Sequence, residues 1–317
     1  SRRSPRSGLV TRIGVSAALA LALALALAAC ASRQEQPLVR EKVIPGEGDV
    51  EMLFVGDVMP ARRAATSARS AAGDRWAEHL FAEFAPQIRG ADVSFANLEC
   101  SVSKRGKRVP AKDYTMRADP EILAAMERVG FDVLSLANNH ILDYGPEAAA
   151  DTLSETVRLG MVPVGLRLSA DVRRQKASIV RVHGLRVAFL AYSQHIPKPF
   201  HGLFPGPFPA DASAIAKDVA RARARADHVI VSIHTGREYS LRPVAVQRRF
   251  AEAAFDAGAT IVVQHHTHTP QPLEVDLPRG RAVAFGLGNF VFDLSMPWKV
   301  YRVRRSVVLR ATLGKKL

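Results

Sequence analysis

The stretch that decides the fold reads Leu136-Ala137-Asn138-Asn139-His140-Ile141-Leu142-Asp143-Tyr144-Gly145. It follows a short apolar run at 131–136 and precedes a helix that is expected to open at Pro146. Two amides, an imidazole and a carboxylate therefore stand where a strand ends and a helix begins. In open α/β sheets, binding sites form at the carboxyl ends of strands. The alternative interpretation is a turn in which Asn139 and Asp143 bond the local backbone.

Beyond this stretch, the hydrophobic pattern changes repeatedly between the strand and the helix period. Strands are predicted from apolar or alternating runs at 50–55, 91–95, 161–164, 177–182, 186–191, 228–233, 260–263, 282–285 and 300–312. Helices are predicted at 74–84, 119–129, 146–159, 211–225 and 243–257. Strands that alternate with helices indicate an α/β layered fold.

Polar residues recur at the predicted strand ends, and together they form a set of metal ligands: Asp57, Glu99, Asn139 with His140, His234, and His266 with His268. Carboxylate, amide and imidazole ligands suit Mn, Fe, Zn or Mg. Two such ions can share a bridging hydroxide and promote in-line attack on an ester. In an extended segment, residues two apart project to the same side. His266 and His268 are therefore expected to face one site, and His265 to point away from it.

A long loop is expected at 194–209, where Pro, Gly, Phe and His are frequent. Long loops are usually functional lids or mobile segments. His195 and His201 lie in this loop and are candidates for contact with a substrate. The alternative is that both are exposed loop histidines.

The chain is strongly basic, with 44 Lys and Arg against 30 Asp and Glu among its 317 residues. Such a charge favours anionic partners, such as an acidic polymer, a phosphoester or anionic lipid headgroups. The alternative is an Arg-rich composition without specific meaning. The basic clusters at 104–108 and 221–225 lack interleaved aromatic residues, and no nucleic-acid motif is present. We therefore expect no nucleic-acid partner.

The N-terminal segment has the three parts of an export signal. Four arginines within residues 2–12 precede an uncharged Ala/Leu run at 17–29, which ends in Cys30. This pattern is typical of a secretory signal peptide, and the ending resembles a bacterial lipoprotein box. An ordinary signal peptide is the alternative. We predict a lipoprotein signal peptide at 1–29, a flexible tether at 30–49 and a folded domain at 50–317.

The predicted processing has consequences for location and for thiol chemistry. Lipidation of Cys30 would anchor the chain in the cell envelope, at the periplasmic side of the outer membrane or the outer face of the cytoplasmic membrane. Cys100 is the other cysteine of the chain, so no intramolecular disulfide is expected after lipidation.

Six motifs, in the same order along residues 50 to 295, resemble the CapA family of poly-γ-glutamate capsule-synthesis proteins, which are related to the calcineurin-like metallophosphatases. They are Phe54-Val55-Gly56-Asp57-Val58-Met59, Asn97-Leu98-Glu99, Ala137-Asn138-Asn139-His140 with Asp143-Tyr144-Gly145, His234-x-Gly236-x-Glu238-Tyr239, His265-His266-x-His268 and Leu287-Gly288-Asn289-Phe290. The resemblance implies a four-layer α/β/β/α sandwich of the metallo-dependent phosphatase type, with a site at the strand ends.

The resemblance also implies roles for individual residues. Divalent metal ions, two in the usual case, would be held by Asp57, Glu99, Asn139, His234, His266 and His268, with Glu99 in the bridging position. His140 would be catalytic, as a group that aids the leaving group or stabilises the transition state. Contacts with the substrate are expected from Arg237, Glu238, His265 and Asn289. One departure is Met59, which stands where the phosphatases have a histidine ligand, so the second metal position is in question.

Two functions follow from these residues. The first is a metal-dependent hydrolase or transferase of the cell envelope that acts on a phosphoester or on a glutamyl amide in polymer biosynthesis, together with membrane-bound polymer-synthesis partners. The second is a non-catalytic lipoprotein that binds or tethers an anionic polymer and has a degenerate metal site. Met59 is the sequence feature that separates the two.

Overall fold

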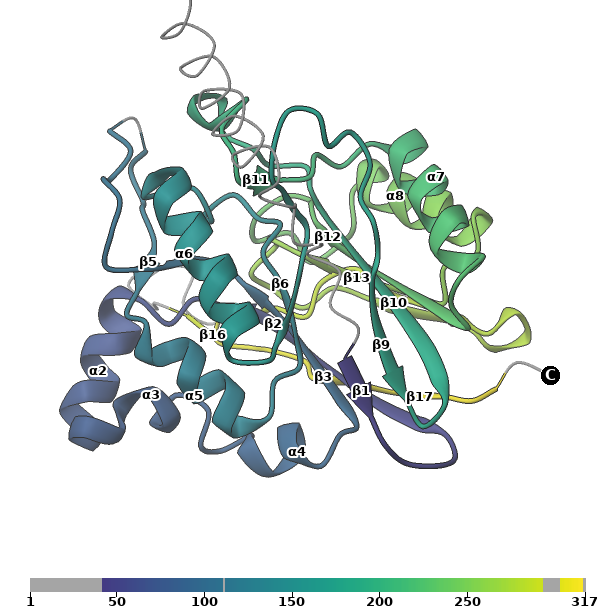
Figure 1. Ribbon diagram of the computed structural model, residues 1–317, viewed down its shortest axis with the longest axis horizontal. Helices are drawn as coiled ribbons and strands as arrows, with labels where there is room; N and C mark the ends of the chain where they lie inside the picture. Colours follow the sequence, from purple (N-terminus) through teal and green to yellow (C-terminus); the bar gives the residue numbers. More distant parts are fainter. Residues whose placement is uncertain (1–41, 111, 293–302, 316–317) are drawn as a thin grey trace, which may run out of the picture. The chain divides into compact units, whose positions relative to one another are not determined.

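The computed structural model of the protein describes residues 42–110, 112–292 and 303–315. Two β-sheets lie face to face, and helices cover their outer surfaces (Figure 1). The predicted four-layer α/β/β/α sandwich is therefore confirmed. The predicted signal peptide at 1–29 and Cys30 lie outside the described residues.

The first sheet has six strands. The candidate ligands Asp57, Glu99 and Asn139 lie in or just after its strands. Its order is β16-β2-β3-β6-β7, with β17 beside β2. All neighbours run parallel except β17, which is antiparallel to β2. The bounds are β2 Val50–Val58, β3 Val93–Leu98, β6 Val133–Ser135, β7 Val162–Val164, β16 Asn289–Val291 and β17 Leu309–Leu313.

The second sheet has seven strands in the order β1-β9-β10-β12-β13-β15-β14. Its central strands β10, β12, β13 and β15 are parallel, whereas β9 is antiparallel to β10 and β14 is antiparallel to β15. The bounds are β1 Lys42–Ile44, β9 Ser178–Val182, β10 Leu185–Ser193, β12 His228–His234, β13 Ile261–His265, β14 Leu273–Asp276 and β15 Arg281–Ala284. Two small ladders join β4 (Ser101–Val102) to β5 (Arg117–Ala118), and β8 (Leu166–Arg167) to β11 (Gly206–Pro207).

The helices divide between the two outer surfaces. Beside the six-stranded sheet lie α2 Arg62–Ala72, α3 Trp76–His79, α4 Ala85–Arg89, α5 Glu121–Val129 and α6 Gly145–Arg158 (Figure 1). On the seven-stranded sheet lie α7 Ala212–Arg223 and α8 Ala245–Asp256, whose apolar faces pack onto β10, β12 and β13. Short 3₁₀ turns are η1 Gly73–Arg75, η2 Lys198–Phe200 and η3 Leu277–Arg279. Among the described residues, none of these helices has the length and apolar character that crossing a bilayer requires.

The main core lies between the two sheets. Valines, isoleucines and phenylalanines of both sheets form one buried cluster. Within it, the Phe95 ring of β3 stacks on the Phe189 ring of β10 at 6.2 Å and 8° between planes. Because the strands of a parallel sheet are buried on both faces, they appear in the sequence as continuous apolar runs. This explains why their positions could be predicted.

Several boundaries differ from the sequence-based expectation. Residues 42–44, expected within the tether, form β1 and pair in parallel with 180–182 of β9. The helix expected at 74–84 is interrupted, because η1 and α3 are followed by turns. The last strand, expected at about 300–312, spans 309–313 within the described residues, and 303–308 lie outside it. The segment 194–209 contains η2 and β11, and its Phe200 and Phe208 are buried.

Candidate metal centre at the strand ends

The six predicted metal ligands lie together at the carboxyl ends of strands from both sheets. Two groups have ligand atoms within 4.8 Å of one another: Glu99 with His266 and His268, and Asp57 with Glu99 and His234. Asn139 joins them, because its side-chain oxygen lies 3.0 Å from His234 Nε2. The topology brings these residues together, because parallel strands of one sheet end at the same edge.

The strand that presents Asp57 is distorted immediately before it. The pairing of β2 with β3 shifts register between Phe54 and Asp57, and such irregularities are frequent next to functional sites. The backbone of Gly56 approaches β16 so closely that a Cβ at this position would lie 2.0 Å from the Gly288 carbonyl oxygen. The Asp57 N–H donates to that same carbonyl at 2.9 Å. Glycine at position 56 thus fixes the place of the first carboxylate.

Glu99 has a position that protein groups alone do not satisfy. Its side chain is fully buried, and among the described residues neither carboxylate oxygen accepts a hydrogen bond. His234 Nε2 lies 3.5 Å and His268 Nε2 3.8 Å from Glu99 Oε1. Burial, together with the charge of Asp57, raises the pKa of Glu99 well above its usual value. A buried carboxylate without partners is costly, and a metal cation would compensate this cost.

Asp57 has the opposite electrostatic environment. Its Oδ1 accepts from Asn97 Nδ2 at 2.9 Å, and its Oδ2 lies 3.3 Å from His268 Nδ1. Burial by itself would raise the pKa of Asp57, but the neighbouring His265 and His268 imidazoles outweigh burial and hold it well below the usual value. Asp57 is therefore the ionised carboxylate of the cluster.

The imidazoles differ in their affinity for protons. Burial, followed by the neighbouring imidazoles, lowers the pKa values of His234 and His266 well below the usual value. Their ring nitrogens His266 Nδ1 and His234 Nε2 lie only 3.1 Å apart. For His268, the carboxylates of Glu99 and Asp57 outweigh burial and raise the pKa to about 9. Neutral imidazole is the form that binds a metal, and His234 and His266 are in that form at neutral pH.

His265 is oriented differently from our expectation. The chain is not extended beyond it, because His266 and His268 have φ angles of 88° and 55° in the left-handed region. The prediction that His265 points away is therefore wrong, since the alternation of an extended strand does not apply here. His265 Nδ1 lies 3.2 Å from Asp57 Oδ1, and its ring stacks on Phe95 at 6.3 Å. With its buried position, it is suited to orient Asp57 from the core side.

His140 belongs to a buried polar group at the stretch 136–145. Its Nδ1 lies 2.6 Å from Asp143 Oδ2, and Asp143 also accepts the Met116 N–H at 2.6 Å. Lys112 Nζ donates to Asp143 Oδ1 at 2.6 Å and lies 3.0 Å from His140 Nδ1. Burial lowers the pKa of His140, and the hydrogen bond to Asp143 only partly opposes it. Asp143, which the alternative interpretation placed in a backbone turn, therefore orients His140.

The expected substrate contacts other than His265 have different exposures. Arg237 and Glu238 are exposed on the loop that follows β12. Asn289 is buried on β16, and its Oδ1 lies 3.0 Å from His268 Nδ1. Asn289 is thus placed to hold His268, whereas Arg237 and Glu238 can meet a ligand from solution. Met59 is fully buried, and a thioether stands there in place of the histidine ligand of the phosphatases.

The cluster also includes residues that the sequence did not single out clearly. The His195 ring stacks on the His266 ring, with centroids 3.8 Å apart, and His195 Nε2 lies 3.0 Å from the Gly236 carbonyl oxygen. The second loop histidine, His201, is exposed and bonds the carbonyl of Ile196. Lys112 lies in a polar loop without periodicity, so no local signal identified it.

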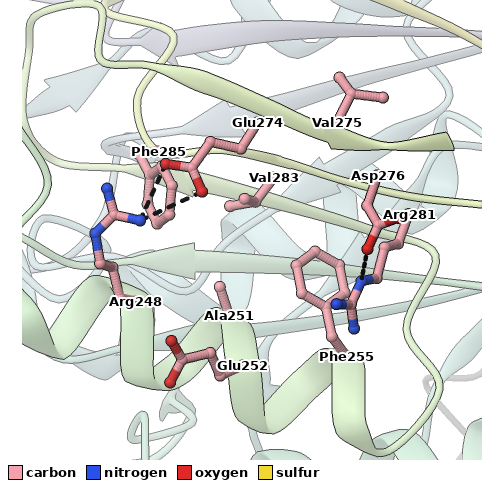
Figure 2. A pocket seen from close by; sticks show the side chains of 10 residues that line it. All are labelled: Arg248, Ala251, Glu252, Phe255, Glu274, Val275, Asp276, Arg281, Val283 and Phe285. Atoms are coloured by element: carbon pink, nitrogen blue, oxygen red, sulfur yellow. Dashed lines mark hydrogen bonds and ion pairs between the residues drawn. The ribbon is translucent and has the colours of Figure 1, made fainter. Parts of the chain in front are cut away.

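A separate hollow of about 350 Å³ lies between α8 and the strands β14 and β15 (Figure 2). Its floor includes Phe255 and Phe285, and the ion pairs Arg248–Glu274 and Arg281–Asp276 flank it. No predicted metal ligand lines this hollow. It is therefore distinct from the candidate metal centre.

A four-layer α/β/β/α sandwich with buried carboxylates, an amide and imidazoles at the strand ends defines a protein of the metallophosphatase fold. Residues 51–294 match the family model described as Bacterial capsule synthesis protein PGA_cap, and the chain belongs to this family. The predicted family is thereby confirmed.

Three relatives support the same family. The PGA biosynthesis protein CapA of Bacillus subtilis (strain 168) is 33% identical over 265 residues, which cover 83% of this chain and 67% of the relative. The Capsule biosynthesis protein CapA of Bacillus anthracis is 30% identical over 253 residues, covering 76% and 59%. A Probable polyglutamine synthesis accessory protein of Mycobacterium tuberculosis is 29% identical over 214 residues, covering 64% and 56%. This chain thus spans about two thirds or less of the length of these relatives.

Proposed function

We propose that the chain is a metal-dependent hydrolase or transferase that acts on an anionic polymer of the cell envelope, at a phosphoester or a glutamyl amide bond. The observation that supports this most directly is Glu99, whose two buried oxygens have no partner among the described residues while three imidazoles and Asp57 surround it. The names of the relatives, which refer to PGA, capsule and polyglutamine synthesis, support the choice of polymer.

The donor set fits a divalent cation. Asp57, Glu99, Asn139, His234, His266 and His268 would hold it, because oxygen and imidazole ligands suit Mn, Fe, Zn or Mg. When bound, the metal would supply Lewis acidity and a water activated for attack. The neutral His234 and His266 offer lone pairs to a cation without first releasing a proton.

His140 is placed to exchange a proton with the leaving group. Asp143 fixes its Nδ1, and Nε2 makes no hydrogen bond among the residues that the structure describes. Burial lowers the pKa of His140, and the hydrogen bond to Asp143 only partly opposes burial, so the neutral imidazole can exchange a proton at Nε2. Lys112 pairs with Asp143 at 2.6 Å. An imidazole that is oriented in this way is suited to general acid–base catalysis.

For the cell, we propose an envelope lipoprotein anchored through Cys30 that works with membrane-bound polymer-synthesis proteins. The leader pattern at 1–30 supports this location. Replacing Cys30 by Ala in the full chain is expected to move the protein from the membrane fraction to the soluble envelope fraction. Unchanged retention in membranes would contradict the lipid anchor.

A second candidate function, binding without catalysis, is favoured by one observation. Met59 is buried at the place of an expected histidine ligand, and the loss of one ligand weakens the second metal position. In that case the protein would bind an anionic polymer and show no turnover.

The experiment that separates the two functions uses the full chain purified without chelator. Metal content is measured by elemental analysis, and turnover is measured with a generic phosphodiester and with a γ-glutamyl anilide in Mn²⁺. We expect bound metal and turnover of one substrate, and loss of both in Glu99→Gln. Glu252→Gln, which changes an exposed carboxylate away from the site, serves as the matched control. Less than one metal per chain together with no turnover would refute the catalytic proposal.

A further inference from the structure

Two asparagines of the sequence motifs, Asn97 and Asn138, have no part in the chemistry proposed above, yet both are buried beside it. Asn97 lies on β3, opposite Asp57 of the neighbouring strand β2 (Figure 1). Asn138 lies just beyond β6, the strand on the other side of β3. Asn97 is 0% and Asn138 1% exposed. A buried amide is costly unless its polar atoms are hydrogen-bonded, so the partners of these side chains show what they hold.

Asn97 contacts a candidate metal ligand on each sheet. Its Nδ2 donates to Asp57 Oδ1 at 2.9 Å and lies 3.4 Å from His234 Nδ1. Asp57 belongs to the six-stranded sheet, and His234 ends β12 of the seven-stranded sheet. Because an ionised carboxylate only accepts hydrogen bonds, the atom that faces Asp57 must be the amide nitrogen. The side-chain oxygen of Asn97 is therefore left to accept a bond from another residue.

Asn138 joins Asn97 to the backbone of His140. The Nδ2 of Asn138 donates to Asn97 Oδ1 at 3.4 Å and to the Leu98 carbonyl oxygen at 2.8 Å. Its Oδ1 accepts from the His140 N–H at 3.0 Å. The Leu98 carbonyl belongs to the peptide group that leads into Glu99. Asn138 therefore holds the backbone both before Glu99 and at His140.

A local turn explains only part of these contacts. The bond from the His140 N–H to the Asn138 side chain is that of an Asx turn, which needs no residue outside the stretch 136–145. The other two bonds of Asn138 reach residues 40 and 41 positions earlier in the sequence, on β3. A side chain that only shaped a turn would not need these bonds. Three hydrogen bonds thus follow one another from Asp57 through both amides to His140.

His140 is therefore fixed at two points. Asp143 holds its ring at Nδ1, whereas Asn138 holds its backbone N–H. The contact at the ring sets the direction of the imidazole, and the contact at the backbone sets how far the whole residue lies from Asp57. Misplacing a catalytic group by about 1 Å can lower a rate about 100-fold. The backbone contact can therefore affect proton exchange without any contact between Asn138 and a substrate.

We propose that Asn97 and Asn138 are positioning residues that set the separation between the candidate metal centre and His140. This role deepens the proposed function, on which it rests, because it names the groups that hold the proton-exchanging residue in place relative to the metal ligands. In this role neither amide contacts a substrate or a cation. Asn97 acts through Asp57, and Asn138 acts through the backbone of His140, so the two asparagines should affect different measurements.

The first test changes Asn138 in the full chain. Asn138→Ala removes all hydrogen bonds of the side chain, whereas Asn138→Asp keeps an oxygen for the His140 N–H and loses both N–H donors. With the substrate that wild type turns over, we expect kcat to fall about 100-fold in both variants and KM to stay within about threefold. Metal content should be unchanged, because the Glu99 N–H keeps its bond to the Val58 carbonyl. Full activity of Asn138→Asp would show that Asn138 only shapes the turn, which would overturn the inference.

A double variant shows whether Asn138 acts through His140. His140→Ala should lower kcat by about 100-fold or more. Adding Asn138→Ala to it should lower kcat by less than about twofold further, because the effects of residues that act as a unit are not additive. Losses that multiply in the double variant would contradict this assignment.

Gln175→Ala is the matched control for stability. It removes another buried amide, which bonds the backbone N–H and carbonyl of Ala191 at 2.8 and 2.9 Å. Thermal melting should show losses of about 2–12 °C in both Gln175→Ala and Asn138→Ala. The kcat of the control should stay within about twofold of wild type. An equal fall of kcat in the two variants would mean that Asn138 acts only through stability, against the inference.

The second test measures metal affinity, which does not depend on turnover. Asn97→Ala removes the N–H that orients Asp57, so the Mn²⁺ dissociation constant, measured by isothermal titration calorimetry, should rise about 10- to 100-fold. Asn97→Ser, which shortens the side chain and withdraws the donor from Asp57, takes its place if Asn97→Ala does not fold. Gln175→Ala should bind Mn²⁺ as wild type does. An unchanged Mn²⁺ affinity in the Asn97 variant would overturn the role of Asn97.

Crystal structures of metal-free wild type and Asn138→Ala separate this inference from the proposed function. We expect the Cα of His140 to move by about 0.5 Å or more relative to Asp57. If wild type neither binds Mn²⁺ nor shows turnover while His140 moves in the variant, the proposed function fails and the positioning of His140 by Asn138 stands. If His140 keeps its wild-type place, the inference fails, whether or not wild type turns over a substrate.

Discussion

Replacing Glu99 by Gln should change stability in opposite directions with and without metal. In the metal-free protein, Glu99 is a fully buried carboxylate whose two oxygens have no partner among the described residues. Gln has nearly the same shape and no charge, so the variant avoids the cost of burying that charge. With metal present, however, the variant loses a charged ligand. The metal-free variant should therefore be more stable than wild type, and the metal-loaded variant less stable.

The size of the effect follows from the environment of the carboxylate. An unsatisfied buried polar group costs about 1–3 kcal/mol, and more when it is charged. In a domain of this size, about 1 kcal/mol shifts the melting temperature by about 2–4 °C. We therefore expect the metal-free variant to melt about 2–10 °C above metal-free wild type. A metal at a hundred times its dissociation constant stabilises the native state by about 2.7 kcal/mol, which wild type should gain and the variant should largely lose.

The pH dependence has a defined sign. Because burial raises the folded pKa of Glu99, its contribution to stability is complete below the unfolded pKa and is lost as pH rises through the folded pKa. The advantage of the metal-free variant should therefore grow with pH. The assay is thermal melting of chelated protein across pH, followed by titration with Mn²⁺. Equal Mn²⁺ stabilisation of both proteins, or a metal-free variant that melts below wild type, would refute the reasoning.

Three further predictions concern the proposed catalytic histidine His140, the expected ligand position at Met59 and the core. Asp143→Asn removes the acceptor that orients His140, so kcat should fall at least about 100-fold with unchanged metal content; an unchanged kcat would show that His140 is not positioned by Asp143. Met59→His restores an imidazole at a buried position, and elemental analysis should show more metal per chain than in wild type, whereas equal content would indicate that residue 59 cannot reach the ions. Phe189→Ala removes a ring stacked between the sheets and should lower the free energy of unfolding, measured in urea, by about 3–5 kcal/mol. Leu277→Ala changes a residue that is 81% exposed and should lower it far less. Similar losses of unfolding free energy in the two variants would contradict the assigned core.

The layers and the ligand cluster could be predicted because they depend on regular patterns. Buried parallel strands are continuous apolar runs, and the polar residue that ends such a run stands at a common edge of the sheet. Asp57 and His234 were found in this way. The sandwich itself required the resemblance to a known family, because alternation of strands and helices predicts layers but not the pairing of two sheets.

The remaining features depend on tertiary contacts or on local backbone angles. Lys112 lies in an irregular loop, and only the folded chain brings it to His140. His195 could not be distinguished from an exposed loop histidine, because its contact is with a residue 71 positions later in the sequence, His266. The direction of His265 was wrong because the residues after it leave the extended region, and nothing in the side chains of histidines signals a positive φ.

The position of β2 has a consequence for the order of assembly. This strand presents Asp57, yet among the described residues one of its flanks pairs only with β16 and β17, which come late in the sequence. The ion pair between Arg310 and Glu51 joins residues 259 positions apart. A chain emerging gradually from a ribosome or a translocation channel would therefore hold β2 as an open edge until β16 and β17 have emerged, and open edges invite pairing with other chains. Completion of the candidate metal centre should then wait for β16 and β17, and chaperones that shield strand edges should matter most before these two strands have emerged.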